Sequence, residues 1–118
     1  MTSASRAIAT ARLRAADLPR PTVLVCAEDV AAGKPSPEGY LVAAARLGVV
    51  AASCIVVEDA ATGIESAHAA GMHSIAVTTT HSESELEAAD VVINDLTELP
   101  SAISVSYTHL TLPTNREV

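Results

Sequence analysis

The sequence contains no tryptophan and no phenylalanine, and only two of its 118 residues are tyrosines. Because aromatic rings supply much of the buried area in most cores, a core here must be built from small aliphatic side chains. Hydrophobic residues make up 49% of the chain, which is enough for a folded domain and excludes a disordered one. The length suits one small domain with a single core.

Positive charge is also scarce. The sequence has seven lysines and arginines but fourteen aspartates and glutamates, so the formal net charge is −7. Such an acidic chain is poorly suited to a nucleic-acid backbone or an anionic membrane, and we expect neither as a partner. A small anionic ligand can still bind where a cation and a metal ion cluster locally. Nothing in the sequence indicates an oligomeric state.

Long apolar runs and cysteine frameworks are absent too. No run is long enough to span a membrane and no signal peptide opens the chain, so we expect a cytoplasmic protein. Cys26 and Cys54 lie in or beside predicted strands and are expected to be reduced, buried thiols.

The remaining pattern alternates between strands and helices. Residues 55–57 form an apolar, β-branched run, and a small-residue helix follows that ends at Gly71. Further strands are predicted at 22–27, 74–78 and 91–93, and further helices at 6–16, 37–47, 83–89 and 96–103. This alternation predicts an α/β fold, a three-layer Rossmann-like parallel sheet with helices on its faces.

Three groups of polar residues are candidates for a binding site. Thr2, Ser3 and Ala4 open the first helix, where hydroxyls and backbone N–H groups can bind phosphate. Lys34 is fixed between a glycine and a proline. Glu58 and Asp59 follow the strand 55–57, at the end where ligands bind in open parallel sheets, and carboxylates suit Mg²⁺. Together these groups suit phosphoryl transfer.

Each group also has a simpler interpretation. Thr2 and Ser3 could only cap a helix, Lys34 could be a solvated loop lysine, and the acidic pair could be a helix cap with a solvated neighbour. The four histidines suit surface or packing roles, although His81 follows the end of a predicted strand and could approach a ligand. The order and spacing of the three groups, rather than any single group, favour a functional site.

Over about residues 2–99 the chain resembles the C-terminal part of haloacid dehalogenase-like hydrolases, especially their sugar- and glycerol-phosphate phosphatases. The segment AEDVAAGKPSPEGYLVAAARLG resembles the third motif of that family, with Lys34 as its lysine. The segment IVVEDAATGIESAHAAGM resembles the fourth motif, and TSAS resembles the second.

This resemblance implies a role for each group. Asp59 would bind Mg²⁺, assisted by Glu58 directly or through water. Lys34 would be the catalytic lysine that neutralises charge between the nucleophile and the phosphoryl oxygens. Ser3, or Thr2 one register away, would bind the phosphoryl group with the N–H of Ala4. The substrate would be a small phosphorylated metabolite, such as a sugar or polyol phosphate, hydrolysed through an aspartyl-phosphate.

The family's first motif, Asp-x-Asp, is missing, since no two of the five aspartates lie two residues apart. The cap domain is missing as well. We therefore expect residues 1–105 to be an incomplete core domain, inactive alone, whose strands 22–27 and 55–57 lack their shared neighbour and expose aggregation-prone edges. Residues 106–118 are expected to be a non-homologous, disordered or artefactual tail. The alternatives are a fragment of a phosphosugar mutase of the β-phosphoglucomutase kind, or a non-catalytic module.

Overall fold

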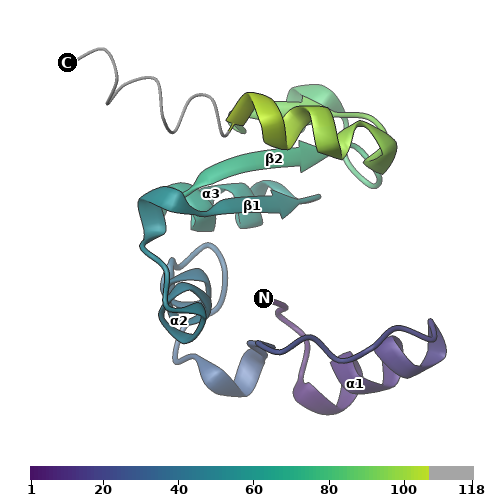
Figure 1. Ribbon diagram of the computed structural model, residues 1–118, viewed down its shortest axis with the longest axis vertical. Helices are drawn as coiled ribbons and strands as arrows, with labels where there is room; N and C mark the ends of the chain where they lie inside the picture. The colour runs from purple at the N-terminus through teal and green to yellow at the C-terminus, as the bar shows by residue number, and fades with distance from the viewer. Residues whose placement is uncertain (107–118) are drawn as a thin grey trace.

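Three parallel strands form the centre of the molecule. The computed structural model describes residues 1–106, and its sheet has the order β1-β2-β3, with β1 at Ile55–Glu58, β2 at His73–Val77 and β3 at Val91–Ile93 (Figure 1). Val56 is aligned with Ser74 in the first pair, and Ala76 with Val92 in the second. The predicted α/β class with a parallel sheet is confirmed, and the three strands at 55–57, 74–78 and 91–93 are each found within one residue.

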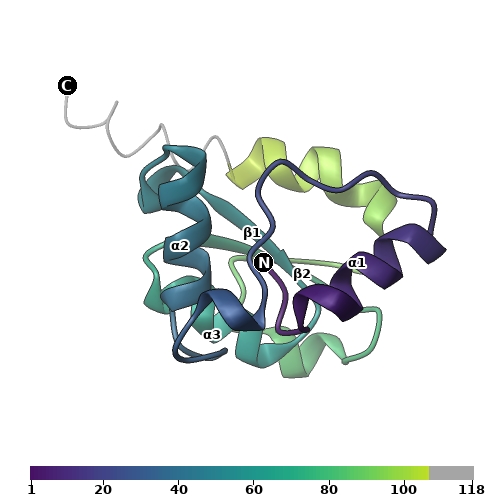
Figure 2. The same cartoon turned by 90° about the horizontal axis from the view of Figure 1, so that it is seen from below.

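Helices cover both faces of this sheet. On one face, α2 (Glu38–Leu47) and α3 (Ala61–Ala69) pack against Val56. On the other face, a helix over residues 99–106 packs against Ile75 and Ile93 (Figure 2). The buried side chains are mostly alanine, valine, isoleucine and methionine, as the lack of aromatics predicts. Three layers therefore form with a core of small aliphatic groups.

The N-terminal part forms a separate unit below the sheet in Figure 1. It contains α1 (Arg6–Ala15), as predicted, but the strand predicted at 22–27 does not form. Residues 1–5 run beside it in the same direction, joined by two backbone hydrogen bonds of 2.9 Å, from Thr2 N to Val25 O and from Ala27 N to Ala4 O. An apolar run becomes a strand only when a neighbour completes a regular ladder, and two isolated bonds do not.

Several short elements are 3₁₀ turns. They are η1 (Ala27–Asp29), η2 (Ala51–Ser53), η3 (Glu83–Leu86) and η4 (Leu96–Glu98). The acidic helix predicted at 83–89 is thus only the turn η3, and the closing helix begins later than expected, at residue 99. Within the described range, no helix is long and apolar enough to cross a membrane. Apart from Ser106, the tail predicted at 106–118 lies outside the described residues.

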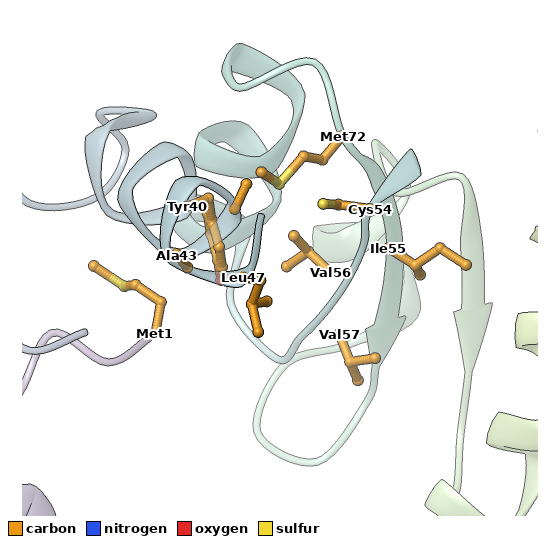
Figure 3. Close-up of a pocket in the computed structure, with 10 residues that line it drawn as sticks. Met1, Tyr40, Ala43, Leu47, Cys54, Ile55, Val56, Val57 and Met72 are labelled. Atoms are coloured by element: carbon orange, nitrogen blue, oxygen red, sulfur yellow. The ribbon is translucent and has the colours of Figure 1, made fainter. Parts of the chain in front are cut away.

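The outer edge of β1 is open. Among the described strands β1 pairs only with β2, and a cavity of about 400 Å³ borders its other side (Figure 3). The side chains of Tyr40, Leu47 and Val57 line this cavity, and Met1 reaches it from the N-terminal unit. Unpaired strand edges beside apolar surface promote association between chains. The aggregation expected from the sequence stays a prediction, now with a defined location.

Asp29 ties the N-terminal unit to α2. Its Oδ2 accepts a hydrogen bond of 2.8 Å from Cys26 N and pairs with Arg6, while its Oδ1 lies 3.7 Å from Nη2 of Arg46. The hydrogen bond from Cys26, followed by the charge of Arg6, holds the pKa of Asp29 below its usual value. A lowered pKa stabilises the fold above the usual pKa of about 3.9, and this contribution is lost as pH falls through the folded value.

We therefore expect Asp29→Asn to be less stable than the unaltered chain at pH 6, and to lose less stability on acidification to pH 3. Urea unfolding at the two pH values measures both differences. Asp17→Asn is the matched control, because Asp17 has a φ of 55° that asparagine adopts equally well. An Asp29→Asn variant with unchanged acid dependence would contradict the assignment.

Candidate functional site

A partly buried ion pair lies where β1 ends. The Nζ of Lys34 is 2.7 Å from Oε2 of Glu58, and the two side chains are only 13% and 10% exposed. Glu58 is the last residue of β1, and Lys34 comes from the loop before α2, where its peptide bond to Pro35 is cis. Lys34 is therefore not a solvated loop lysine, and it is the only lysine in the sequence.

Tyr40, in the first turn of α2, completes this pair. Its hydroxyl donates a hydrogen bond to Oε2 of Glu58, and its ring centroid lies 5.3 Å from Nζ of Lys34. Burial alone would raise the pKa of Glu58, but the hydrogen bonds from Lys34 and Tyr40 outweigh it and lower that pKa. Burial, and then the bond to Glu58, raise the pKa of Tyr40. The sequence predicts a helix at 37–47 but assigns Tyr40 no role in the site.

The Glu58 side chain lies across the first turn of α3. A Cβ added to Gly63 would come within 2.0 Å of Cδ and 2.1 Å of Cγ of Glu58. No other side chain than hydrogen fits there without moving Glu58. Gly63 lies inside the segment that resembles the fourth motif, but no local pattern indicates that it makes room for the Glu58 carboxylate.

Asp59 lies next to this cluster at the mouth of the sheet. Its N–H donates to Oε1 of Glu58 over 3.4 Å, and its carbonyl accepts a hydrogen bond from Nδ1 of His81 over 3.0 Å. The Asp59 carboxylate itself takes no hydrogen bond or ion pair from the part of the chain that the structure describes. His81 is thus brought to the site through the Asp59 backbone, and the acidic side chain stays available to a ligand.

In residues 2–5, the segment that resembles the second motif, only Ser5 caps the helix that follows. Ser5 is the N-cap of α1 and accepts from the N–H of Ile8 over 3.3 Å, while Thr2 Oγ1 accepts from Ala4 N over 3.2 Å. Ser3 is exposed, and no described group bonds its hydroxyl. Thr2 and Ser3 therefore do not cap α1, and the Ser3 hydroxyl is available.

The N-terminal segment lies beside the buried pair. Burial, and next the charge of Lys34, lower the pKa of the Met1 amino group, which also senses Glu58. Within residues 1–106 no hydrogen bond joins Ser3 to Lys34 or Asp59. The structure thus unites Lys34, Glu58 and Asp59, and places Ser3 on a neighbouring segment that no shared sheet connects to them.

Glu58 and Asp59 provide some, but not all, of the ligands that a hard cation needs. Nowhere in residues 1–106 are three or more histidine, cysteine, aspartate or glutamate side chains arranged to hold a metal ion. Mg²⁺, however, is usually held by only one or two protein carboxylates, with water and substrate phosphate completing its coordination. The free carboxylate of Asp59 suits that role, and Glu58, held by Lys34 and Tyr40, would assist through water.

Comparisons with known proteins point to one family. The model of the haloacid dehalogenase-like hydrolase family matches residues 1–77. Hexitol phosphatase A of Escherichia coli is 43% identical over 99 residues, which cover 84% of this chain and 46% of that protein. Validoxylamine A 7'-phosphate phosphatase of Streptomyces hygroscopicus is 48% identical over 77 residues, which cover 65% of this chain and 36% of that protein.

Solved structures show the same likeness. A hydrolase from Pseudomonas syringae superposes with a TM-score of 0.80 at 29% identity, over 87% of this chain and 50% of that one. β-Phosphoglucomutase from Clostridium difficile superposes with a TM-score of 0.66 at 29% identity, over 75% of this chain and 39% of that one. The chain spans half or less of the length of each of these relatives.

Proposed function

The chain belongs to the haloacid dehalogenase-like hydrolase family, and on that premise we propose that it carries the lysine and metal-binding half of a Mg²⁺-dependent phosphatase. Its substrate would be a small phosphorylated metabolite, such as a sugar or polyol phosphate. The two relatives reported above are named as phosphatases of a hexitol and of a validoxylamine phosphate, which supports this substrate class. The cytoplasmic location expected from the sequence remains a prediction.

One observation carries the proposal. The single lysine of the chain, 13% exposed, lies against Glu58 at the carboxyl end of β1, next to an aspartate whose carboxylate takes no hydrogen bond or ion pair from residues 1–106. A buried lysine with this partner is aimed in a fixed direction and can meet the charge of a phosphoryl group. Catalysis of phosphoryl transfer depends mainly on such positioning and charge stabilisation.

Each residue then has a defined task. Lys34 neutralises charge on the phosphoryl oxygens, and Glu58 holds its ammonium in place. The Ser3 hydroxyl and the Ala4 N–H bind the phosphoryl group, with Thr2 as the second candidate for the hydroxyl. Asp59 holds Mg²⁺ with help from Glu58, and the ion when bound supplies further positive charge at the phosphate.

The attacking carboxylate must come from outside these residues, because no Asp-x-Asp occurs in the sequence. We propose that an extended segment carrying it fills the open edge of β1, beside the apolar cavity, and joins the sheet to residues 1–4. We call the chain supplied with such a segment the completed protein. The nucleophile would form an aspartyl-phosphate, with the alcohol leaving, and water would then release phosphate.

A phosphosugar mutase is the second candidate, supported by the likeness to β-phosphoglucomutase. Both reactions use the same lysine and acidic pair. They differ in the fate of the phosphoryl group, since a mutase returns it to a sugar and a phosphatase transfers it to water. A non-catalytic module is the third reading, favoured only by the missing Asp-x-Asp.

Phosphate release separates these readings. With Mg²⁺ and p-nitrophenyl phosphate, we expect the 118-residue chain to release no phosphate above a blank, and the completed protein to turn over. Removal of Mg²⁺ with EDTA should abolish that turnover, and added Mg²⁺ should restore it. Turnover by the chain alone would refute the need for an added segment. A completed protein that stays inactive on every phosphate ester tested, including hexose phosphates, would refute the phosphatase.

A further inference from the structure

Tyr40 touches both charged members of the site. Its hydroxyl donates to the same oxygen of Glu58 that accepts from Lys34, and its ring lies under the Lys34 ammonium at 5.3 Å. A cation above an aromatic face within about 6 Å is attracted to the ring. One side chain thus acts on the lysine through its face and on the carboxylate through its hydroxyl.

Packing in the apolar core, rather than the contact with Lys34 and Glu58, holds the Tyr40 ring in place. Tyr40 is 8% exposed and belongs to the apolar cluster of Ala44, Val56 and Met72, so packing of α2 against the sheet fixes its position. Lys34 and Glu58, in contrast, come from a loop and from a strand end. Tyr40 is a buried group that contacts both of these segments.

We propose that Tyr40 is a positioning residue of the phosphate site, whose ring and hydroxyl together set the direction of the Lys34 ammonium. Without the hydroxyl, Oε2 of Glu58 loses one of its two donors, and the lysine follows a more mobile carboxylate. Without the ring, the ammonium also loses the surface beneath it. The catalytic part of this inference rests on the proposed function, but the positioning of Lys34 does not.

Because Lys34 is the only lysine, how firmly its side chain is held can be measured from the reactivity of its amine. An N-hydroxysuccinimide acetate ester labels only Lys34 and the terminal amine, which are resolved by mass spectrometry after digestion. We expect Lys34 to be acetylated about 10-fold faster in Tyr40→Phe than in the unaltered chain. Tyr40→Leu should be faster still, because it also loses the ring. Leu41→Ala, at an exposed position of the same helix, is the control and should leave the rate unchanged.

Two labelling results would overturn the positioning. One is a Tyr40→Phe rate equal to that of the unaltered chain. The other is a rate for the unaltered chain equal to that in 8 M urea, a denaturing concentration, which would mean that Lys34 is not held at all.

Kinetics of the completed protein provide the catalytic readout. We expect Tyr40→Phe to lower kcat about 10-fold while KM for the ester stays within about 2-fold, since the hydroxyl acts on the lysine through Glu58 and not on the leaving group. A residue needed only for folding would change the amount of folded protein and leave the labelling rate of the folded fraction unaltered. An inactive completed protein refutes the proposed function, whereas unchanged labelling refutes the role of Tyr40, so the two failures are distinguishable.

Discussion

Lys34→Ala is expected to lower kcat/KM of the completed protein by about 1,000-fold. Among residues 1–106 the ammonium is the one lysine or arginine group paired with Glu58, so its removal leaves the charge of the phosphoryl group without this counter-charge. The measurement is phosphate release at saturating Mg²⁺, with the fraction of folded protein followed by circular dichroism.

The control for this variant is Arg14→Ala. Arg14 is an exposed cation in the last turn of α1, so the substitution makes the same change in net charge away from the site. It should leave kcat/KM within about 2-fold of the unaltered value. Lys34→Arg tests the geometry, because a planar guanidinium in a site shaped for a point charge should restore little activity. A folded Lys34→Ala variant that keeps more than a tenth of the activity would exclude Lys34 from catalysis.

Gly63→Ala is expected to lower the free energy of unfolding by about 1–3 kcal/mol, as overpacked positions do. The sign is informative, because alanine in place of glycine inside a helix normally raises stability by about 1 kcal/mol. Here the new methyl group would lie about 2 Å from the Glu58 side chain, which cannot move without breaking its bonds to Lys34 and Tyr40. Urea unfolding of the 118-residue chain measures the change.

Two variants make this test specific. Gly33→Ala is the control, since within residues 1–106 no heavy atom beyond its chain neighbours lies within 4 Å of its added Cβ, and it should change stability by no more than about 0.5 kcal/mol. In a Glu58→Ala background the obstructing atoms are gone, so Gly63→Ala should become neutral or stabilising. The resulting double-mutant cycle should show a coupling of about 1 kcal/mol or more. If Gly63→Ala lowered the free energy of unfolding equally in both backgrounds, the clash with the Glu58 side chain would be disproved.

The elements that the sequence predicted well are those with local signals. Gly48 ends α2 and Gly71 follows α3, both at positive φ, so the helix ends were readable from single residues. The acidic doublet was placed correctly at the end of β1, because an apolar run followed by two carboxylates has few other interpretations. The prediction of a strand at 22–27 was wrong, because an apolar pattern does not show whether a neighbouring strand is present to pair with it.

The parts of the site that sequence reasoning missed depend on distant contacts. The hydroxyl of Tyr40 meets a carboxylate 18 residues away, and nothing in the pattern of α2 distinguishes that tyrosine from a core residue. The need for glycine at position 63 follows from the path of the Glu58 side chain, which no local spacing encodes. His81 was noticed from its place after a strand, yet its contact is with the backbone of Asp59 and not with its acid group.

The solitary lysine has a practical consequence for anyone handling the protein. Coupling through amines, whether to a sensor surface, a dye or biotin, can reach no lysine side chain other than the one buried in the site. Such conjugates will carry their label either at the terminal amine or at the cost of the Lys34–Glu58 contact. Cys54, predicted to be buried, is partly accessible, and attachment there spares the Lys34–Glu58 contact but places the label at the cavity beside β1.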